Sequence, residues 1–126
     1  MPTETLTTAE YHKRYGKGRR KGKKRGEMNK LELRFAQEVL ILEQAAGEIK
    51  SYQYEAIKLK LANGAWYTPD FDVYMSDGSL VFYEVKGHWR EAARLRIKVA
   101  AEAHQEHLFI AVQRDRKTGV WRYEEF

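Results

Sequence analysis

Three charged residues near the middle of the chain have the side chains that metal-assisted hydrolysis requires. Asp70 follows Pro69, and Glu84 and Lys86 come after a gap of thirteen residues. Two carboxylates at close range repel each other unless a cation lies between them, and hard oxygen ligands suit Mg²⁺ or Mn²⁺. A lysine on the same face can offset the negative charge, orient a water molecule and support its deprotonation near the metal. These residue types therefore indicate hydrolysis at a phosphorus centre, provided that the side chains meet.

We expect these side chains on two neighbouring antiparallel strands. Strand-forming residues fill 66–75 and 80–85, and the turn sequence Ser76-Asp77-Gly78 separates them. Because side chains alternate along a strand, Glu84 and Lys86 lie on the same face.

The length of the turn decides whether Asp70 joins that face. A two-residue turn would pair Phe71 with Glu84 and would place Asp70 on the opposite face. A three-residue turn with Gly78 in the left-handed conformation pairs Asp70 with Glu84, with their β-carbons about 5 Å apart. This register also collects a uniformly apolar face, made of Phe71, Val73, Met75, Val81, Tyr83 and Val85. We therefore expect the three-residue turn; the competing interpretation is an exposed face with Asp, Glu and Lys for solubility.

The rest of the chain predicts the helices and strands that would support this pair. Asn29 and Glu32 have the spacing of a capping box, at the start of a helix that ends at Gly47. Asn63-Gly64 is a strong hairpin signal. The helices are expected at 29–47 and 89–107, and the strands at 54–61, 66–75, 80–85, 108–112 and 120–123. The order of one helix, three antiparallel strands, one helix and a strand predicts an α/β fold with a mixed sheet flanked by helices.

Positive charge is concentrated before this predicted fold. The segment from His12 to Arg25 contains nine Lys and Arg residues and no acid, whereas the rest of the chain has 14 basic and 18 acidic residues. Such a block repels itself, so we expect a flexible basic arm at 1–28 before the domain at 29–126. Counterion release favours its binding to DNA or RNA, and a solubilising tail is the alternative. The expected contacts are Arg19, Arg20, Lys21, Lys23, Lys24 and Arg25.

The composition excludes several other classes of site. A chain of 126 residues fits one domain, and 43% hydrophobic residues are typical of a globular protein. Without cysteine there is neither a disulfide framework nor a thiolate metal site. Without a long apolar run we expect no signal peptide and no membrane span, and hence a cytoplasmic protein.

Pro69-Asp70, followed after thirteen residues by Glu84-Val85-Lys86, resembles the signature of the PD-(D/E)XK nuclease superfamily. The longer stretches Tyr67-Thr68-Pro69-Asp70-Phe71 and Glu84-Val85-Lys86-Gly87-His88-Trp89 strengthen the resemblance. Residues 31–112 look like a phage-encoded branch of that superfamily, which includes Holliday junction resolvases and restriction-type endonucleases.

The resemblance implies a fold and a set of roles. It implies a restriction-endonuclease-like αβββαβ core. It implies that Asp70 and Glu84 bind the metal, that the carbonyl of Val85 is a further ligand, and that Lys86 assists the attacking water.

Related nucleases often add an acidic residue from the first helix, and Glu32 and Glu38 compete for that role. On the helical wheel Glu32 falls inside the apolar arc, whereas Glu38 falls near Arg34 outside it. An inward carboxylate is costly without a metal or another cation. Glu32 is therefore the expected additional catalytic and metal-binding residue, and its role as the third residue of the capping box with Asn29 stays open beside it.

Four basic residues of the second predicted helix are candidate DNA contacts. Arg96 lies in the middle of the apolar arc, where it would reach the metal site or a phosphate, or form a buried ion pair with an acid. Arg90, Arg94 and Lys98 recur at intervals of four residues and form an exposed stripe. The stripe is either a contact with the DNA backbone or a solvated helix face.

These patterns together predict a Mg²⁺- or Mn²⁺-dependent endonuclease that hydrolyses DNA. Small size, the basic arm and the family resemblance favour branched DNA as the substrate, and nucleases that cut two strands usually act as homodimers. The rival interpretations are a nucleic-acid-binding module whose acidic pair is structural, and an RNA-cleaving enzyme of the same fold.

Overall fold

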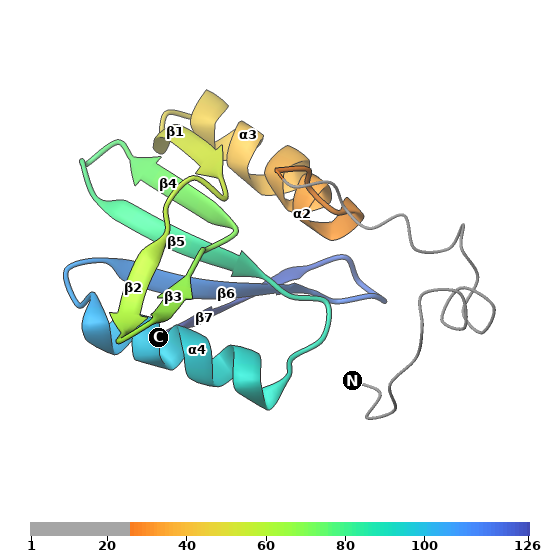
Figure 1. Ribbon diagram of the computed structural model, residues 1–126. Coiled ribbons are helices and arrows are strands. Elements are labelled where there is room, and N and C mark those ends of the chain that lie inside the picture. The colour runs from red at the N-terminus through yellow and green to blue at the C-terminus, as the bar shows by residue number, and fades with distance from the viewer. Residues whose placement is uncertain (1–25) are drawn as a thin grey trace.

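A mixed five-stranded sheet forms the centre of the computed structural model, which describes residues 26–126 (Figure 1). The strand order is β1-β4-β5-β6-β7; β5 and β6 are parallel, and the other neighbours are antiparallel. The strands are β1 Ile49–Tyr54, β4 Phe71–Met75, β5 Leu80–Val85, β6 Leu108–Arg114 and β7 Trp121–Glu125. A separate two-stranded sheet pairs β2 (Leu59–Ala62) with β3 (Ala65–Tyr67). The fold is therefore mixed α/β, as predicted, and the predicted arm contacts lie outside the described residues.

The first helix runs through three consecutive segments on one face of this sheet. The α-helical segments α2 (Lys30–Phe35) and α3 (Ile41–Ala45) flank the π-helical segment η2 (Ala36–Leu40). Asn29 caps α2 in the predicted capping box with Glu32. The inner side of the helix is buried against the predicted apolar face of the sheet, in a core that contains Phe35, Ala36, Leu40, Ile49, Phe71, Val73, Val81, Tyr83, Val85 and Val112.

The second helix, α4 (Glu91–Ala103), covers the opposite face of the sheet together with the β2–β3 hairpin (Figure 1). Helix, hairpin and sheet meet in a second core of buried side chains, made of Leu59, Tyr67, Phe82, Ile97, Ala100, Phe109 and Ala111. Among residues 26–126, no helix has both the length and the apolar character that a membrane crossing needs.

The turn between β4 and β5 has the predicted three-residue register. Phe71 is paired with Tyr83, so the register, continued by one residue, sets Asp70 opposite Glu84. Gly78 has a φ of +92°, a left-handed conformation that glycine adopts without steric cost. The choice of register made from the apolar pattern is therefore confirmed.

The strand predicted before the hairpin was placed wrongly. Instead of one strand over 54–61, the chain forms β1 and β2, which are separated by a bend where Glu55 has a φ of +48°. Because β1 rather than β2 pairs with β4, the three-stranded meander is β1-β4-β5 and the β2–β3 hairpin is a separate excursion. The strand predicted over 66–75 is likewise interrupted at Thr68-Pro69-Asp70, since proline has no backbone N–H to donate to a ladder.

Candidate functional site

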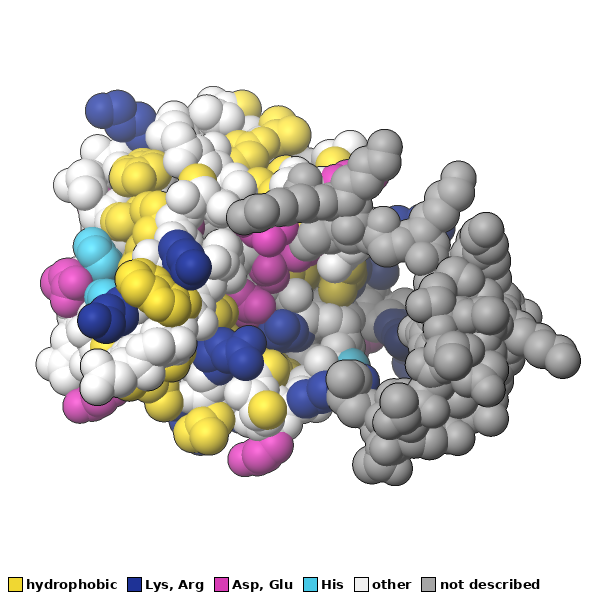
Figure 2. Space-filling model, viewed as in Figure 1, with side chains coloured by type: hydrophobic (Ala, Val, Ile, Leu, Met, Phe, Trp, Pro, Cys, Tyr) yellow, Lys and Arg dark blue, Asp and Glu magenta, His cyan; other side chains and the backbone are white. Residues whose placement is uncertain are grey.

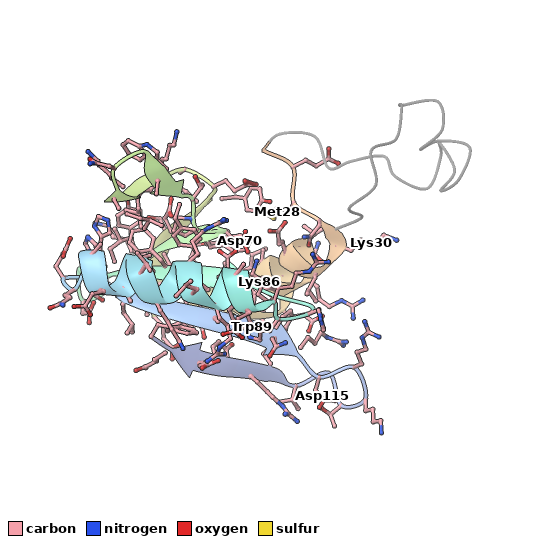
Figure 3. All side chains as sticks on the ribbon, turned by 60° about the horizontal axis from the view of Figure 1, so that its bottom comes forward. Met28, Lys30, Asp70, Lys86, Trp89 and Asp115 are labelled. Atoms are coloured by element: carbon pink, nitrogen blue, oxygen red, sulfur yellow. The ribbon has the colours of Figure 1, made fainter. Side chains whose placement is uncertain are left out.

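Asp70 lies at the end of the sheet where β4 begins and β5 ends. Its Oδ2 atom accepts a hydrogen bond from the backbone N–H of Val85 at 2.8 Å. Figure 3 shows Asp70 and Lys86 close together at this end of the sheet. The register and this hydrogen bond together bring Asp70, Glu84 and Lys86 to one place, as the sequence predicts.

Glu84 is a buried carboxylate with a protein donor on each oxygen. Only 8% of its surface is exposed. The hydroxyl of Tyr67 donates to Glu84 Oε2 at 2.6 Å, and Lys86 Nζ lies 3.0 Å from Glu84 Oε1. Glu84 is therefore held in one orientation, and the charge of Lys86 is directed at it.

Glu32 reaches the same place from the first helix. Its residue is 3% exposed, so the predicted inward orientation is confirmed. Glu32 Oε1 accepts hydrogen bonds from the backbone N–H of Asn29 at 2.9 Å and from the hydroxyl of Tyr54 at 2.8 Å. Its side chain also shares a hydrogen bond with Asp70. The capping role and a place beside Asp70 therefore coexist.

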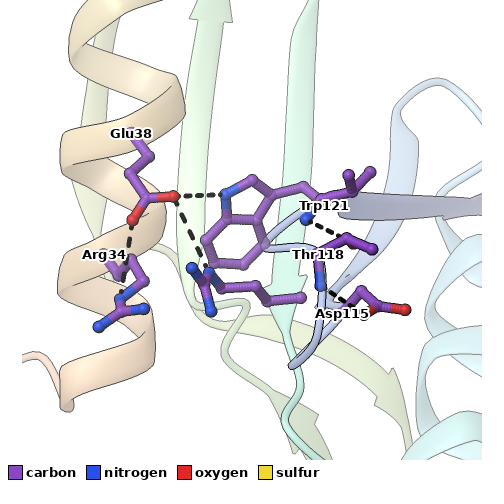
Figure 4. A network of polar contacts seen from close by, with 7 residues as sticks. Arg34, Glu38, Asp115, Thr118 and Trp121 are labelled. Carbon is purple, nitrogen blue, oxygen red and sulfur yellow. Dashed lines mark hydrogen bonds and ion pairs between the residues drawn. The ribbon is translucent and has the colours of Figure 1, made fainter.

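Glu38, the competitor of Glu32, lies elsewhere. It is exposed beside Arg34, at 3.7 Å, as the helical wheel predicts. The indole N–H of Trp121 donates to Glu38 at 3.2 Å, and Arg114 approaches it at 3.9 Å (Figure 4). Glu38 therefore ties the first helix to the β6–β7 hairpin and takes no part in the acidic group.

Burial and two neighbouring carboxylates raise the pKa of Asp70. Burial is the largest cause, the negative charges of Glu84 and Glu32 add to it, and the N–H of Val85 opposes it, so that the pKa of Asp70 rises to about 9. Burial and the charge of Glu84 also raise the pKa of the Tyr67 hydroxyl, which therefore stays protonated and donates. Burial and neighbouring negative charge at Asp70 therefore favour either a retained proton or a bound cation.

The donor set fits a hard divalent cation. Its oxygens come from carboxylates, and a cation would relieve the repulsion that raises the pKa of Asp70. In the described part of the chain, no group of three His, Cys, Asp or Glu side chains is arranged to hold a metal ion. Oxygens of Glu32 and Glu84 instead contact the backbone of Asn29, the hydroxyl of Tyr67 and the ammonium group of Lys86. A bound cation would compete with these donors.

Arg96 is exposed, and its predicted position in the middle of the buried arc of the helix is wrong. Ile97 and Ala100 are the buried residues of α4 instead, because the helix packs the face that contains them against the sheet and the hairpin. Arg96 lines a cavity of about 300 Å³ between α4 and the hairpin, with Leu61 and Leu95 among its neighbours. Its charge acts on the hydroxyl of Tyr67, so it lies near the acidic group without being buried in it.

Arg94 is not part of an exposed stripe, which corrects another prediction. Its two terminal nitrogens each lie 2.6 Å from an oxygen of Glu124. The guanidinium also lies over the rings of Trp89 and Phe126, at 5.4 and 5.3 Å. The last strand occupies this side of the helix, which the helical wheel of α4 alone did not reveal. Of the stripe, Arg90 and Lys98 remain exposed.

Three neighbours of the site were missed by the sequence reasoning. Tyr67 and Tyr54 orient Glu84 and Glu32, and the only signal for Tyr67 was its place just before Pro69-Asp70. Glu55 donates its backbone N–H to the carbonyl of Asp70 at 2.9 Å, and its side chain contacts Tyr54. A glutamate with positive φ is uncommon, and nothing in the sequence around Glu55 indicates it.

One end of the sheet thus carries Glu32, Asp70, Glu84 and Lys86, with tyrosine hydroxyls between them. No family model, curated protein or solved structure gives a significant match to this chain. Within the described part of the chain, the site consists of carboxylate and hydroxyl oxygens with the ammonium group of Lys86 against Glu84.

Proposed function

We propose that this protein is a metal-dependent endonuclease of the PD-(D/E)XK type that hydrolyses phosphodiester bonds in DNA. The observation that carries the proposal is the cross-strand placement of Asp70 and Glu84, with Lys86 Nζ 3.0 Å from Glu84. Chance surface charges would not be expected to be buried, and Glu84 is 8% exposed. The third carboxylate, Glu32, is 3% exposed and lies beside Asp70.

The order of elements also supports this assignment. The chain has the element order of the αβββαβ core. The first helix is followed by the antiparallel strands β1, β4 and β5, then by the helix α4 and the parallel strand β6. In that core the β2–β3 hairpin is an insertion between the first and second strands. The two acids of the motif then lie just before the second strand of the meander and near the end of the third strand. Glu32 of the first helix lies beside Asp70.

Asp70, Glu84 and Glu32, with the carbonyl of Val85, are the residues that would hold Mg²⁺ or Mn²⁺. When bound, the cation supplies positive charge that polarises the phosphodiester and acidifies water. The chain supplies the rest. Lys86 Nζ contacts Glu84 directly, where it would donate to a water bound beside the two side chains and stabilise the negative charge that develops at phosphorus. Tyr67 is a positioning residue, because it acts through Glu84.

The substrate and the assembly are part of the same proposal. The basic arm and the exposed Arg90 and Lys98 supply positive charge for the DNA backbone, whereas Asp70 and its neighbours supply the chemistry. Small size, the basic arm and the family resemblance favour branched DNA as the substrate, and the cutting of two strands favours a homodimer as the active species.

A second candidate function is a nucleic-acid-binding module whose acidic group is structural. It is favoured by the protein donors that already occupy the oxygens of Glu32 and Glu84. Such a module would bind DNA without cutting it, and its binding would not depend on Mg²⁺. An RNA-cleaving enzyme with the same site differs from the first proposal only in its substrate.

The deciding experiment is incubation of the purified protein with linear, nicked, single-stranded and four-way-junction DNA, with Mg²⁺ and with EDTA. RNA molecules of the same sequences are tested in parallel. The proposal expects cleavage with Mg²⁺ only, lost in Glu84→Gln and retained in Glu102→Gln, whose side chain is exposed on α4. Binding without any metal-dependent cleavage would favour the binding module, and cleavage of RNA alone would change the substrate.

A further inference from the structure

The outer face of the β2–β3 hairpin carries an exposed tryptophan between two lysines. Trp66 is 48% exposed. Lys58 Nζ lies 5.0 Å from the centroid of its ring, and Lys60 is the cross-strand partner of Trp66. Cross-strand partners share one face of a sheet, so the three side chains form one surface, which we call the hairpin platform.

The platform is fixed to the body of the protein by the other face of the hairpin. Leu59 and Tyr67 are buried there, in the core shared with α4. The ring nitrogen Nε2 of His104 lies 2.8 Å from the carbonyl oxygen of Lys60 and ties the hairpin to the end of the helix. The exposure of Trp66 therefore belongs to an anchored strand, in which Leu59 and Tyr67 alternate inward and the platform faces outward.

The platform is continuous with the acidic site. Tyr67, the residue after Trp66, donates its hydroxyl to Glu84 at 2.6 Å. Neighbouring α-carbons are about 3.8 Å apart, so one strand carries both the platform and a contact to the candidate site. In Figure 2, hydrophobic surface flanked by Lys or Arg side chains over the hairpin lies on the same face as the group of acidic side chains.

We propose that the hairpin platform binds an unpaired segment of DNA next to the scissile phosphodiester. Trp66 stacks on a base, and Lys58 and Lys60 contact the neighbouring phosphates. An aromatic ring beside positive charge is the combination that binds single strands, whereas a base inside a duplex has both faces covered by its neighbours. The idea that this segment leads to the cleavage point rests on the proposed function, but the binding itself does not.

The two lysines favour nucleic acid over an apolar partner. A hydrophobic peptide or a second copy of the chain would bury Lys58 and Lys60 beside Trp66, and burying two unpaired ammonium groups is costly. The platform therefore complements a polyanion with exposed bases, and we assign it to DNA.

The test measures the binding of a fluorescent single-stranded DNA and of the blunt duplex of the same sequence to the full chain, by anisotropy in EDTA. Trp66→Ala is expected to weaken single-strand binding roughly fivefold to a hundredfold, to leave duplex binding nearly unchanged, and to be rescued by Trp66→Phe. Tyr123→Ala is the matched control, because Tyr123 is a 50% exposed aromatic residue on β7. Equal losses for both DNAs, or no loss with Trp66→Ala, would overturn the inference.

A salt series tests the lysines separately. Replacing Lys58 and Lys60 together by Ala should reduce the slope of log affinity against log salt on single strands by about 1.4, at roughly 0.7 for each phosphate contact. Replacing the exposed Arg116 and Lys117 of the β6–β7 turn in the same way is the control. Identical reductions in both double variants would show a general charge effect and would contradict a specific platform.

The outcome for the platform is separable from the outcome for the proposed nuclease. If the protein cleaves DNA with metal and Trp66→Ala does not change single-strand binding, the platform proposal is wrong and the nuclease proposal stands. Loss of single-strand binding in a protein that never cleaves would leave the platform and remove the nuclease. Tighter Trp66-dependent binding of RNA of the same sequence would overturn the assignment to DNA.

Discussion

The two faces of β4 and β5 are built from alternating residues of the same strands, yet only one of them buries carboxylates beside its apolar side chains. The face toward the first helix buries Phe71 and Val73 in an apolar core. The face toward α4 and the hairpin buries Asp72 at 0% exposure and Glu84 at 8%. Buried carboxylates cost free energy unless they are paired, so the second face lowers the stability that the first face supplies. Within one hairpin, the first face therefore stabilises the fold and the second face carries the candidate catalytic residues.

Two aspartates show how different the buried acids are. Burial raises the pKa of Asp72 to about 6, and the backbone amides of Ala56 and Ile57 oppose that rise. Burial raises the pKa of Asp70 to about 9 because Glu84 and Glu32 add to it. Neither carboxylate oxygen of Asp72 accepts a hydrogen bond within the described residues, and no neighbouring carboxylate adds to the rise of its pKa, whereas Asp70 faces other carboxylates. Only at Asp70 do neighbouring negative charges, which a cation would relieve, add to the effect of burial on the pKa.

The largest expected effect is the loss of DNA cleavage when a carboxylate of the site is removed. Asp70→Ala should abolish Mg²⁺-dependent DNA cleavage, because it removes a proposed metal ligand, while the melting temperature in EDTA should not fall. The measurement is cleavage of labelled DNA together with thermal unfolding. Cleavage at the wild-type rate would remove Asp70 from the site, and an unfolded variant would make it a structural residue.

Lys86→Ala should lower the turnover number about a hundredfold to ten-thousandfold, with a much smaller change in DNA affinity. The reason is that Lys86 lies against Glu84, where its charge is needed most in the transition state. Single-turnover cleavage and equilibrium binding separate the two quantities. A loss of affinity with unchanged turnover would make Lys86 a phosphate anchor.

Phe71→Ala tests the apolar face. Phe71 is fully buried against Phe35, so its truncation should lower the free energy of unfolding by about 3 to 5 kcal/mol. The protein that stays folded should keep its turnover number. Chemical denaturation and cleavage at low temperature measure both. If turnover fell while stability held, the separation of the two faces would be refuted.

The residues on each of the two faces could be predicted from the sequence, because one register between β4 and β5 determines both faces. The apolar set that begins with Phe71 chose the three-residue turn, and the turn then set Asp70 opposite Glu84. Glu32 followed from helical periodicity in the same way. Local patterns of this kind are carried by a few neighbouring residues, so they can be read before the fold is known.

The surroundings of the site depended on contacts that no local pattern contains. β1 displaced the predicted strand because the chain bends at Glu55, and the partners of Arg94 come from Glu124 and Phe126 at the far end of the chain. Tyr67 contacts Glu84 only because the hairpin folds back over the sheet. Packing between distant segments decided each of these features.

A further expected effect is a pH dependence of stability. Between the ordinary carboxyl pKa of 3.8 and its pKa of about 9, folded Asp70 keeps a proton that the unfolded chain has released. The free energy of unfolding in EDTA should therefore fall as the pH rises through this range. Asp70→Asn should remove this contribution to the pH dependence. The free energy of unfolding of the variant should therefore exceed that of wild type by most near pH 9. Parallel profiles for the two proteins would show that Asp70 does not hold the proton.

The most direct test of the central claim is Mn²⁺ binding, measured by electron paramagnetic resonance on the full chain with a phosphorothioate DNA that resists cleavage. If Asp70, Glu84 and Glu32 hold the catalytic cation, the wild-type complex binds Mn²⁺, Mg²⁺ displaces it, and Asp70→Asn loses it. Glu38→Gln, whose side chain contacts Trp121 rather than the site, should bind as wild type does. Equal Mn²⁺ binding by wild type and Asp70→Asn, or no binding by either, would contradict the account.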